Sequence, residues 1–390
     1  MGFVILTLRI MNFWQNIDKP IIGLSPMDGV SDASFRFITA KHGGPDVTIS
    51  EFVNIETLIY APHNLVKDLT YSEMERPVVA QIYGHTPELF YQVAHVVCEL
   101  GFDGLDINMG CPAKKVVSKG SGAGLILNPP QARSIIQSAR LGIQHWFEGQ
   151  TLGDLKASQE LIQGVERSNR LRNGTGNPPL RRLIPVSVKT RLGYDQIVVE
   201  DWIQTLLQEK LAAISLHGRT LKQKYRGSAD WESIARAVEL AENSETLILG
   251  NGDLQSMEDV YRRVRETRVD GVLLGRSTQG NPWIFRTKDQ VKQALRHDGA
   301  LEFRPSPVSL EERIRVILEH SDYFQNHCGS PTFVGMRKHL AWYCRGIHGA
   351  SELRAQMVRV SSVSEVMECL KNYVSRLPSR IEPPNHMWLS

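Results

Sequence analysis

Short apolar, β-rich runs alternate with longer amphipathic segments from residue 21 to about residue 285. This alternation is typical of βα units, in which parallel strands form a sheet and helices cover it. Eight strands are predicted, at Ile21–Met27, Val47–Val53, Pro77–Gly84, Gly104–Gly110, Ile184–Gly193, Ala212–Thr220, Thr246–Asp253 and Asp270–Arg276. Helices are predicted between them, for example at Glu88–Leu100, Val199–Glu209, Trp231–Ala241 and Met257–Arg265.

Eight such units predict an α/β fold, a closed (β/α)8 or TIM barrel. The alternative is an open doubly wound sheet, which would carry a Gly-rich dinucleotide turn after an early strand. No GxGxxG motif follows any of the early strands. We therefore expect the barrel.

The chain is long enough for a second domain, because 390 residues exceed the usual size of a single hydrophobic core. After Phe285 helical patterns follow one another without strands, at Leu310–Phe324, Gly335–Cys344, Ala355–Val360 and Val363–Leu377. Pro305 and Pro307 mark a linker. The predicted parts are an N-terminal extension (1–20), the barrel (21–303), a small helical bundle (304–378) and a flexible tail (379–390).

One interval, from about residue 144 to residue 183, is too long for a connection between the fourth helix and the fifth strand. Its second half, 167–182, holds five arginines and no acid. This composition predicts a mobile insertion without a core of its own. It could be a tolerated surface loop or an arm that contacts nucleic-acid phosphates.

Composition excludes several classes of protein. The five cysteines show no CxxC spacing, which argues against a disulfide framework, a zinc site and an iron–sulfur cluster. The first residues lack the pattern of a signal peptide, and no segment reaches membrane-spanning length. We expect a soluble, cytoplasmic, monomeric protein without a membrane partner. The net charge is only +3, and the excess of basic residues lies in 304–390, with 11 basic and 8 acidic residues.

Polar residues follow nearly every predicted strand, where the chemistry of such barrels is found. In chain order they are Ser25-Pro26-Met27-Asp28-Gly29, Glu51, Gln81, Asn108 with Cys111, Lys189 with Arg191, His217 with Arg219, Asn251-Gly252-Asp253 and Gly275-Arg276. A single one could be a satisfied buried polar group, but a full ring of them predicts an active site.

The last two strand ends predict a phosphate site, because Gly-Asn-Gly-Asp and Gly-Arg present small residues and backbone N–H groups to one point. A lysine on the fifth strand and a glutamine on the third could contact the edge of a flavin ring. These features together suit flavin mononucleotide (FMN), with Lys189 and Gln81 at the ring and Arg276 at the phosphate.

Cys111 stands in the segment Asp106-Ile107-Asn108-Met109-Gly110-Cys111-Pro112-Ala113-Lys114-Lys115. A thiol just beyond a strand end, with lysines behind it, can donate a proton or act as a nucleophile. A lone cysteine beside a proline is otherwise often a small buried side chain. The remaining strand ends favour the chemical role.

The chain resembles the tRNA-dihydrouridine synthases of the bacterial type. The resemblance runs from about residue 21 to residue 377 and depends on the combination of motifs rather than on any one of them. The motifs are Pro26-Met27-Asp28-Gly29-Val30-Ser31-Asp32, Gln81-Ile82-Tyr83-Gly84, Asn108 to Lys115, Ser187-Val188-Lys189-Thr190-Arg191-Leu192-Gly193, His217-Gly218-Arg219-Thr220, Asn251-Gly252-Asp253, Gly275-Arg276, and Arg337-Lys338-His339 with Trp342-Tyr343. The insertion at 144–183 departs from the pattern.

The resemblance implies a redox cycle in which NADPH reduces FMN and hydride then passes to C6 of a uridine in tRNA. Cys111 would protonate C5, since a thiol with a reference pKa of about 8.5 is protonated at neutral pH. Asn108 would orient the uracil, and Arg191 and His217 would flank the pocket. By the same resemblance the flavin contacts are Pro26, Met27, Asp28, Gln81, Lys189, His217, Asn251, Gly252, Asp253, Gly275 and Arg276.

The target base has to leave its stack to reach the flavin, so the helical domain would hold the folded RNA. Lys114 and Lys115 would face RNA phosphate, as would a patch comprising Arg337, Lys338, Arg345, Arg354 and Arg359. Two alternatives remain open: a flavin barrel acting on a free pyrimidine, like dihydroorotate dehydrogenase, and a catalytically idle RNA-binding protein.

Overall fold

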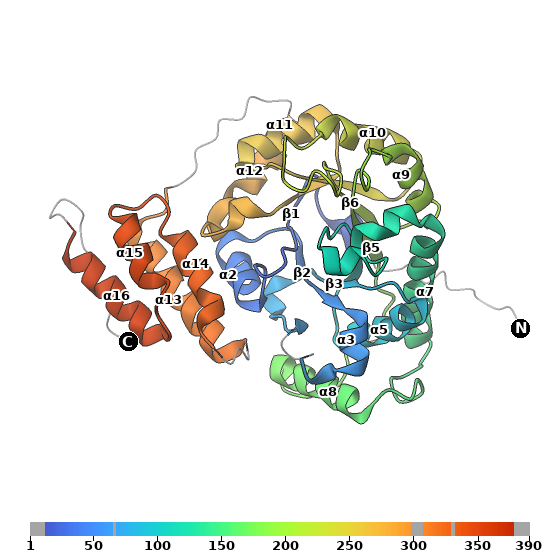
Figure 1. Ribbon diagram of the computed structural model, residues 1–390, viewed down its shortest axis with the longest axis horizontal. Coiled ribbons are helices and arrows are strands. Elements are labelled where there is room, and N and C mark those ends of the chain that lie inside the picture. Colours follow the sequence, from blue (N-terminus) through green and yellow to red (C-terminus); the bar gives the residue numbers. More distant parts are fainter. Residues whose placement is uncertain (1–11, 65–67, 298–306, 329–331, 378–390) are drawn as a thin grey trace, which may run out of the picture.

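A computed structural model describes residues 12–64, 68–297, 307–328 and 332–377. The predicted residues 1–10, part of the linker and the tail lie outside the described residues. Eight parallel strands form a closed barrel in chain order, which confirms the TIM-barrel prediction (Figure 1). The strands are β1 Ile21–Leu24, β2 Thr48–Asn54, β3 Val78–Tyr83, β4 Gly104–Met109, β5 Val186–Arg191, β6 Ala213–His217, β7 Leu247–Asn251 and β8 Gly271–Leu274.

Helices cover the outside of the barrel. They are α1 Phe13–Asn16, α2 Ala33–Gly43, α3 Ile55–Tyr60, α5 Pro87–Glu99, α6 Lys114–Val117, α7 Pro129–Phe147, α8 Gln159–Asn173, α9 Val199–Leu207, α10 Trp231–Ala241, α11 Met257–Thr267 and α12 Lys288–Arg296. Short 3-10 turns connect some of them, among them η5 Pro282–Thr287. Branched and aromatic side chains between barrel and helices are almost completely buried, for example Ile107, Val188 and Trp202.

All strands except β2 end earlier than predicted on the side that carries the polar residues. The run from Ser25 to Met27 leaves the sheet after Leu24, because the backbone turns to bond within its own loop: Val30 and Ser31 N–H donate to the carbonyl of Met27. Residues 25–27 therefore belong to a loop at the barrel mouth and not to β1.

In its described residues, 307–328 and 332–377, the C-terminal domain contains four helices: α13 Leu310–His327, α14 Val334–Tyr343, α15 Ala350–Met357 and α16 Val363–Ser375. The predicted helix at Ala355–Val360 is displaced, since α15 begins and ends earlier around the buried Leu353 and Met357. This domain packs against α2 and η5, and its core includes Ile38 and Trp283 of the barrel domain. The rings of Phe37 and Tyr323 stack across the contact with centroids 3.9 Å apart.

The insertion differs from its prediction, because its second half is not a chain without structure. It begins inside α8, whose Leu161 and Val165 are buried against the barrel domain. Three of its five arginines reach partners that are distant in sequence: Arg172 lies 4.6 Å from the Tyr71 ring, Arg181 lies 4.9 Å from the Trp146 ring, and Arg182 pairs with Asp103 at 2.7 Å. These contacts fasten the insertion to the protein, while Arg167 and Arg170 on α8 are exposed.

Candidate active site

A chain of hydrogen bonds across β3, β4 and β5 leads to the loop that carries Cys111. Ser187 Oγ donates to Asp106 at 2.6 Å, and Gln81 Nε2 donates to the same carboxyl at 2.7 Å. Asn108 Nδ2 donates to Gln81 Oε1 at 3.0 Å. Asp106 lies at the base of this chain, and burial raises its pKa to about 6. The network fixes the rotamers of the inward-facing side chains below the barrel mouth.

Asn108 also holds the loop that follows it. Its Oδ1 accepts from the backbone N–H of Gly110 at 3.0 Å and of Cys111 at 2.8 Å. Arg191 Nε donates to the carbonyl of Gly110 at 2.7 Å from the neighbouring strand. Gly122 is required nearby, since its φ is +57° and a Cβ there would lie 3.1 Å from Cys111 Cβ.

The Cys111 thiol is 7% exposed and lies at the barrel mouth. Burial raises the pKa of this thiol above its ordinary value, and the Asp28 carboxylate acts in the same direction. A thiol in this setting keeps its proton at neutral pH. Lys114 and Lys115 lie on α6 with exposed side chains, and the charge of Lys115 acts against the rise of the thiol pKa without outweighing burial.

Four cations gather at the ends of β5, β6 and β8: Lys189, Arg191, Arg219 and Arg276. Lys189 Nζ lies 3.4 Å from Asn251 Oδ1, and burial lowers the pKa of this lysine to about 8. Burial together with these cations lowers the pKa of His217 to about 2, so its imidazole is neutral. This half of the mouth therefore favours an anion.

One carboxylate, Asp253, lies among these cations and orders them. Its Oδ2 accepts from Arg219 at 2.6 Å and its Oδ1 from Arg276 at 3.0 Å. Arg276 remains half exposed and lies 5.2 Å from the Tyr225 ring. Asp253 itself binds arginines in this structure, so it serves to orient them.

Close backbone approach distinguishes the ends of β7 and β8. Gly252 has a φ of +133°, and a Cβ there would lie 2.7 Å from Ala229 and 3.3 Å from His217. At Gly275 the nearest side-chain atom to an added Cβ is Met27 Sδ, at 3.4 Å. Neighbouring side chains thus pack directly against both glycines, and the loop after β1 covers Gly275.

The loop after β1 is held from two sides. Within the loop, Met27 N–H donates to Ser31 Oγ at 2.8 Å. From β2, Glu51 Oε1 accepts from Val30 N–H at 3.0 Å. The predicted residues Pro26, Met27 and Asp28 therefore stand on a defined loop beside Gly275.

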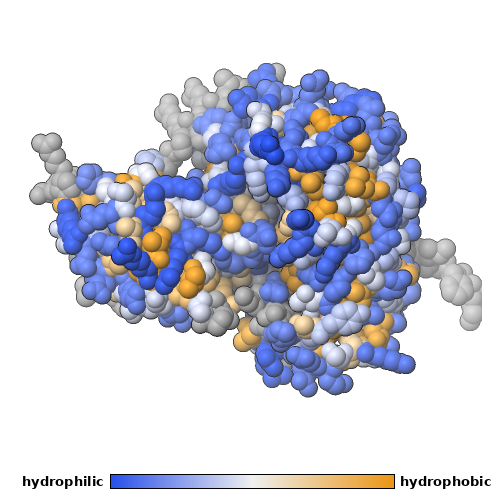
Figure 2. Space-filling model, viewed as in Figure 1, coloured by the Kyte–Doolittle hydropathy of each residue, from blue (hydrophilic) through white to orange (hydrophobic). Residues whose placement is uncertain are grey.

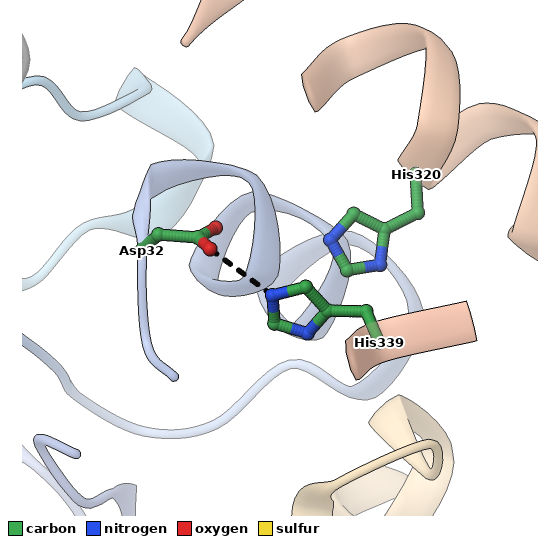
Figure 3. A group of neighbouring side chains, drawn as sticks. All are labelled: Asp32, His320 and His339. Atoms are coloured by element: carbon green, nitrogen blue, oxygen red, sulfur yellow. Dashed lines mark hydrogen bonds and ion pairs between the residues drawn. The ribbon is translucent and has the colours of Figure 1, made fainter. Parts of the chain in front are cut away.

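The helical domain meets this loop through Asp32, His320 and His339 (Figure 3). Their ligand atoms lie within 4.8 Å of one another, a spacing that could suit a metal ion. Hydrogen bonds within the protein already use most of these atoms, however. Asp32 accepts from Phe35 N–H, Ser34 Oγ and His339 Nε2, and His320 lies between Ser34 and Tyr343 at 3.0 Å from each. Within the cluster as described, His339 Nδ1 is the buried ring nitrogen without a partner. We interpret the cluster as an interdomain contact.

Both histidines of this contact are neutral at pH 7. Burial lowers the pKa of both His320 and His339. Burial alone would raise the pKa of Asp32, but His339, His320 and Ser34 bring it well below its usual range. An ionised Asp32 at the start of α2 accepts from the neutral His339 ring and so joins the two domains without a net positive charge.

The predicted basic patch is divided. Arg337 is bound inside the bundle, where it donates to the carbonyl of Val360 at 2.8 Å, to that of Arg359 at 3.2 Å and to Ser361 Oγ at 3.3 Å. Lys338 donates to the carbonyl of Gly29 and lies 3.8 Å from Asp32. Arg345, Arg354 and Arg359 are exposed. Of the predicted patch, Arg337 is thus bound within the bundle and three arginines are exposed.

A cavity of about 460 Å³ opens between the barrel mouth and the helical domain, where Figure 2 shows the surface hollowed. Barrel residues around it include Asp28, Glu51, Tyr83 and Lys115, and Lys338 lines it from the helical domain. The structure brings Gln81, Asn108, Cys111 and the cationic strand ends to the same mouth. Sequence reasoning missed Asp106, although two-residue alternation places it on the same strand face as Asn108.

Comparison with known proteins agrees with this arrangement. A family model described as dihydrouridine synthase (Dus) matches residues 23–144 and 179–378. The chain belongs to the dihydrouridine synthase family. The residues between the two matched segments include α8.

Curated relatives in this family are similar over nearly their full length. A probable tRNA-dihydrouridine synthase of Staphylococcus epidermidis strain ATCC 35984 is 31% identical over 378 residues, which cover 95% of this chain and 99% of the relative. The probable tRNA-dihydrouridine synthase 2 of Bacillus subtilis strain 168 is 31% identical over 376 residues, with the same coverage.

Within the described residues no helix is long and apolar enough to cross a membrane.

Proposed function

We propose that this protein is a flavin-dependent tRNA-dihydrouridine synthase. It reduces the C5–C6 double bond of uridines in tRNA to 5,6-dihydrouridine, with FMN as its cofactor and NADPH as reductant. One observation in this member of the family carries the proposal. Asn108 of β4 and Lys189 of β5 are partners in the strand register, so the Cys111 loop and the cationic strand ends lie at the same barrel mouth.

The residues present fit FMN. Lys189, Arg191, Arg219 and Arg276 supply positive charge for its phosphate and for the electron-rich edge of its ring, opposed locally by Asp253 and the deeper Asp106. Gly252 and Gly275 follow β7 and β8, the strand ends at which barrels of this kind bind a phosphate. Lys189 and Gln81 would hold the ring, the loop from Pro26 to Asp28 would line it, and His217, Asn251, Gly252, Asp253, Gly275 and Arg276 would surround the phosphate side.

Reduced flavin supplies the hydride that is added to C6 of the uracil. Addition at C6 leaves enolate character at C5, which needs an acid within reach. The raised pKa of the Cys111 thiol keeps the proton on sulfur until that step. The sulfur proton passes to C5, and solvent restores it.

Asn108 and Arg191 would position the substrate. Asn108 uses one Nδ2 hydrogen for Gln81, which leaves the second for a uracil carbonyl oxygen. Arg191 is 4% exposed and bound to the Gly110 carbonyl, so it would shape the pocket beside the thiol. Lys114 and Lys115, exposed on α6, would meet RNA phosphates, as would Lys338 on the opposite side of the cavity.

Two measurements test the proposal. The purified protein should carry a yellow chromophore released as FMN, and tRNA from a strain deleted for the gene should lack dihydrouridine at one or more positions. A colourless protein that binds no added FMN would contradict the flavin assignment. A deletion strain with its full set of dihydrouridines, and a purified protein that reduces orotate or free uracil instead, would favour the free-pyrimidine alternative.

A further inference from the structure

Glu51 is directed into the cavity by an irregularity of β2. The β2–β3 pairing runs Ile49↔Val79 and then Phe52↔Gln81, so β2 contains one extra residue between these pairs. Ser50 Oγ closes the gap by accepting from Gln81 N–H at 3.0 Å and donating to the Glu51 carbonyl at 2.9 Å. Bulges of this kind re-aim a side chain next to active sites.

The Glu51 carboxyl is held at one oxygen and open at the other. Among the described residues, Val30 N–H makes the one hydrogen bond to it, at Oε1. Arg36 lies near but directs three of its N–H groups elsewhere, to Glu75, the Ser31 carbonyl and the Thr70 carbonyl. Burial, with Asp32 and Asp28 nearby, raises the pKa of Glu51 to about 7 against the opposing effect of Arg36 and Lys338.

The cavity around Glu51 has the chemistry of a nucleotide site. Phe52 and Tyr83 place two aromatic rings on its wall, with centroids 5.2 Å apart, and Asn54 adds an amide. Lys115 and Lys338 bring positive charge from opposite sides. A volume of about 460 Å³ is within the range of small-molecule pockets and suits one nucleotide.

The Glu51 carboxylate limits which group of a nucleotide can lie beside it. It repels phosphate and attracts hydrogen-bond donors, and the sugar hydroxyl is the donor that distinguishes RNA from DNA. The uracil would lie at Asn108 and Cys111, and the phosphates would lie at the lysines. The ribose between them is then the group that faces Glu51.

We propose that Glu51 accepts a hydrogen bond from a ribose 2′-hydroxyl of the substrate RNA, either at the target uridine or at a directly adjacent nucleotide. This inference rests on the proposed function and adds a positioning residue that makes the enzyme prefer ribose. The contact sets the depth to which the target base enters the barrel mouth.

The test compares tRNA made entirely of ribonucleotides with three tRNAs that each carry one 2′-deoxynucleotide, at the target position or at either neighbour. Dihydrouridine formation is measured in single turnover, and the ribo-to-deoxy rate ratio is taken within each variant so that flavin content cancels. We expect a ratio of about 10 at one of the positions for the parent enzyme, the effect of one hydrogen bond to a charged group.

Glu51→Ala should reduce that ratio to about 1, because the acceptor is gone. Glu51→Gln keeps an oxygen that can accept from Val30 and from the hydroxyl, so it should fold and retain a ratio of about 3, since neutral hydrogen bonds are roughly half as strong. Glu258→Ala, an exposed acid on α11, is the matched control and should keep the parent ratio.

The outcomes separate the two levels of the account. A parent that does not reduce all-ribo tRNA overturns the proposed function and this inference with it. A parent that reduces tRNA but shows no deoxy effect at the three positions overturns the Glu51 contact alone. A Glu51→Ala or Glu51→Gln variant that keeps the full parent ratio also overturns the contact. If such a variant loses rate without a change in the ribo-to-deoxy ratio, the partner of Glu51 is a base N–H instead of the 2′-hydroxyl.

Discussion

Asn108 Oδ1 accepts a hydrogen bond from the backbone N–H of Cys111 at 2.8 Å, which connects the barrel interior to the loop that carries the thiol. The same oxygen accepts from Gly110, while Nδ2 donates to Gln81. Asn108 therefore fixes the direction of the Cys111 side chain through the backbone and presents its remaining N–H to the pocket.

Asn108→Ala should lower uridine reduction at least tenfold, because two backbone N–H groups lose their acceptor and the thiol loses its orientation. Leaving such groups unsatisfied costs about 1–3 kcal/mol each. Asn128→Ala is the matched control, since Asn128 caps α7 on the outside of the barrel domain. Single-turnover rates with tRNA measure the effect. Equal rates for Asn108→Ala and Asn128→Ala would remove Asn108 from the site.

Lys189→Met should weaken FMN binding by a factor of about 10–100 and yet stabilise the apoprotein at pH 7. Burial lowers the pKa of Lys189 to about 8. At pH 7 the buried lysine is therefore charged in an environment that disfavours the charge, and this destabilises the folded apoprotein. The parent should gain stability as the pH rises from about 8 towards 10.5, and the variant should lack that gain. Removing the charge is expected to raise the unfolding free energy by roughly 1–3 kcal/mol at pH 7.

Fluorescence titration with FMN and urea unfolding of the apoprotein test this prediction. If Lys189 served only as an ion-pair partner for Asp106, the variant would instead be less stable and flavin affinity would change little.

Glu51→Gln should stabilise the protein above pH 7 and have no effect below about pH 4.5. The pKa of this carboxyl is raised to about 7, so between 4.5 and 7 the folded state binds more protons than the unfolded state, and stability falls as the pH rises. Glutamine does not titrate. We expect a difference of up to roughly 2–3 kcal/mol at pH 8. Urea unfolding at pH 4.5 and pH 8 measures it, and a pH-independent difference would contradict the raised pKa.

Arg337→Ala should lower the melting temperature without changing the salt dependence of tRNA binding. Its guanidinium donates hydrogen bonds to three acceptors of the bundle. The variant loses these bonds, which join α14 to the segment after α15. Lys115→Ala, which removes an exposed lysine, should instead flatten the salt slope by roughly 0.7–0.9 log unit. A flattened slope in Arg337→Ala with an unchanged melting curve would restore Arg337 to the RNA surface.

The barrel could be predicted from the sequence because each strand is a short apolar run that ends in polar or small residues. That pattern also placed Gln81, Asn108, Lys189 and His217 at one mouth. The arginines were not predictable in the same way. Arg172 and Arg181 contact rings more than thirty residues away, and Arg337 contacts carbonyls 22 and 23 residues away. Only the packed fold shows that these charges are already bound.

The most direct test of the account is dihydrouridine formation by the purified protein with FMN, NADPH and an unmodified tRNA transcript, measured by mass spectrometry of the digested RNA. The parent and Cys98→Ala, which changes a buried cysteine of α5, should both form dihydrouridine. Cys111→Ala should oxidise NADPH but form at least a hundredfold less dihydrouridine, because the acid of C5 is missing. Equal product from Cys111→Ala, or none from the parent with FMN bound, would contradict the central claim.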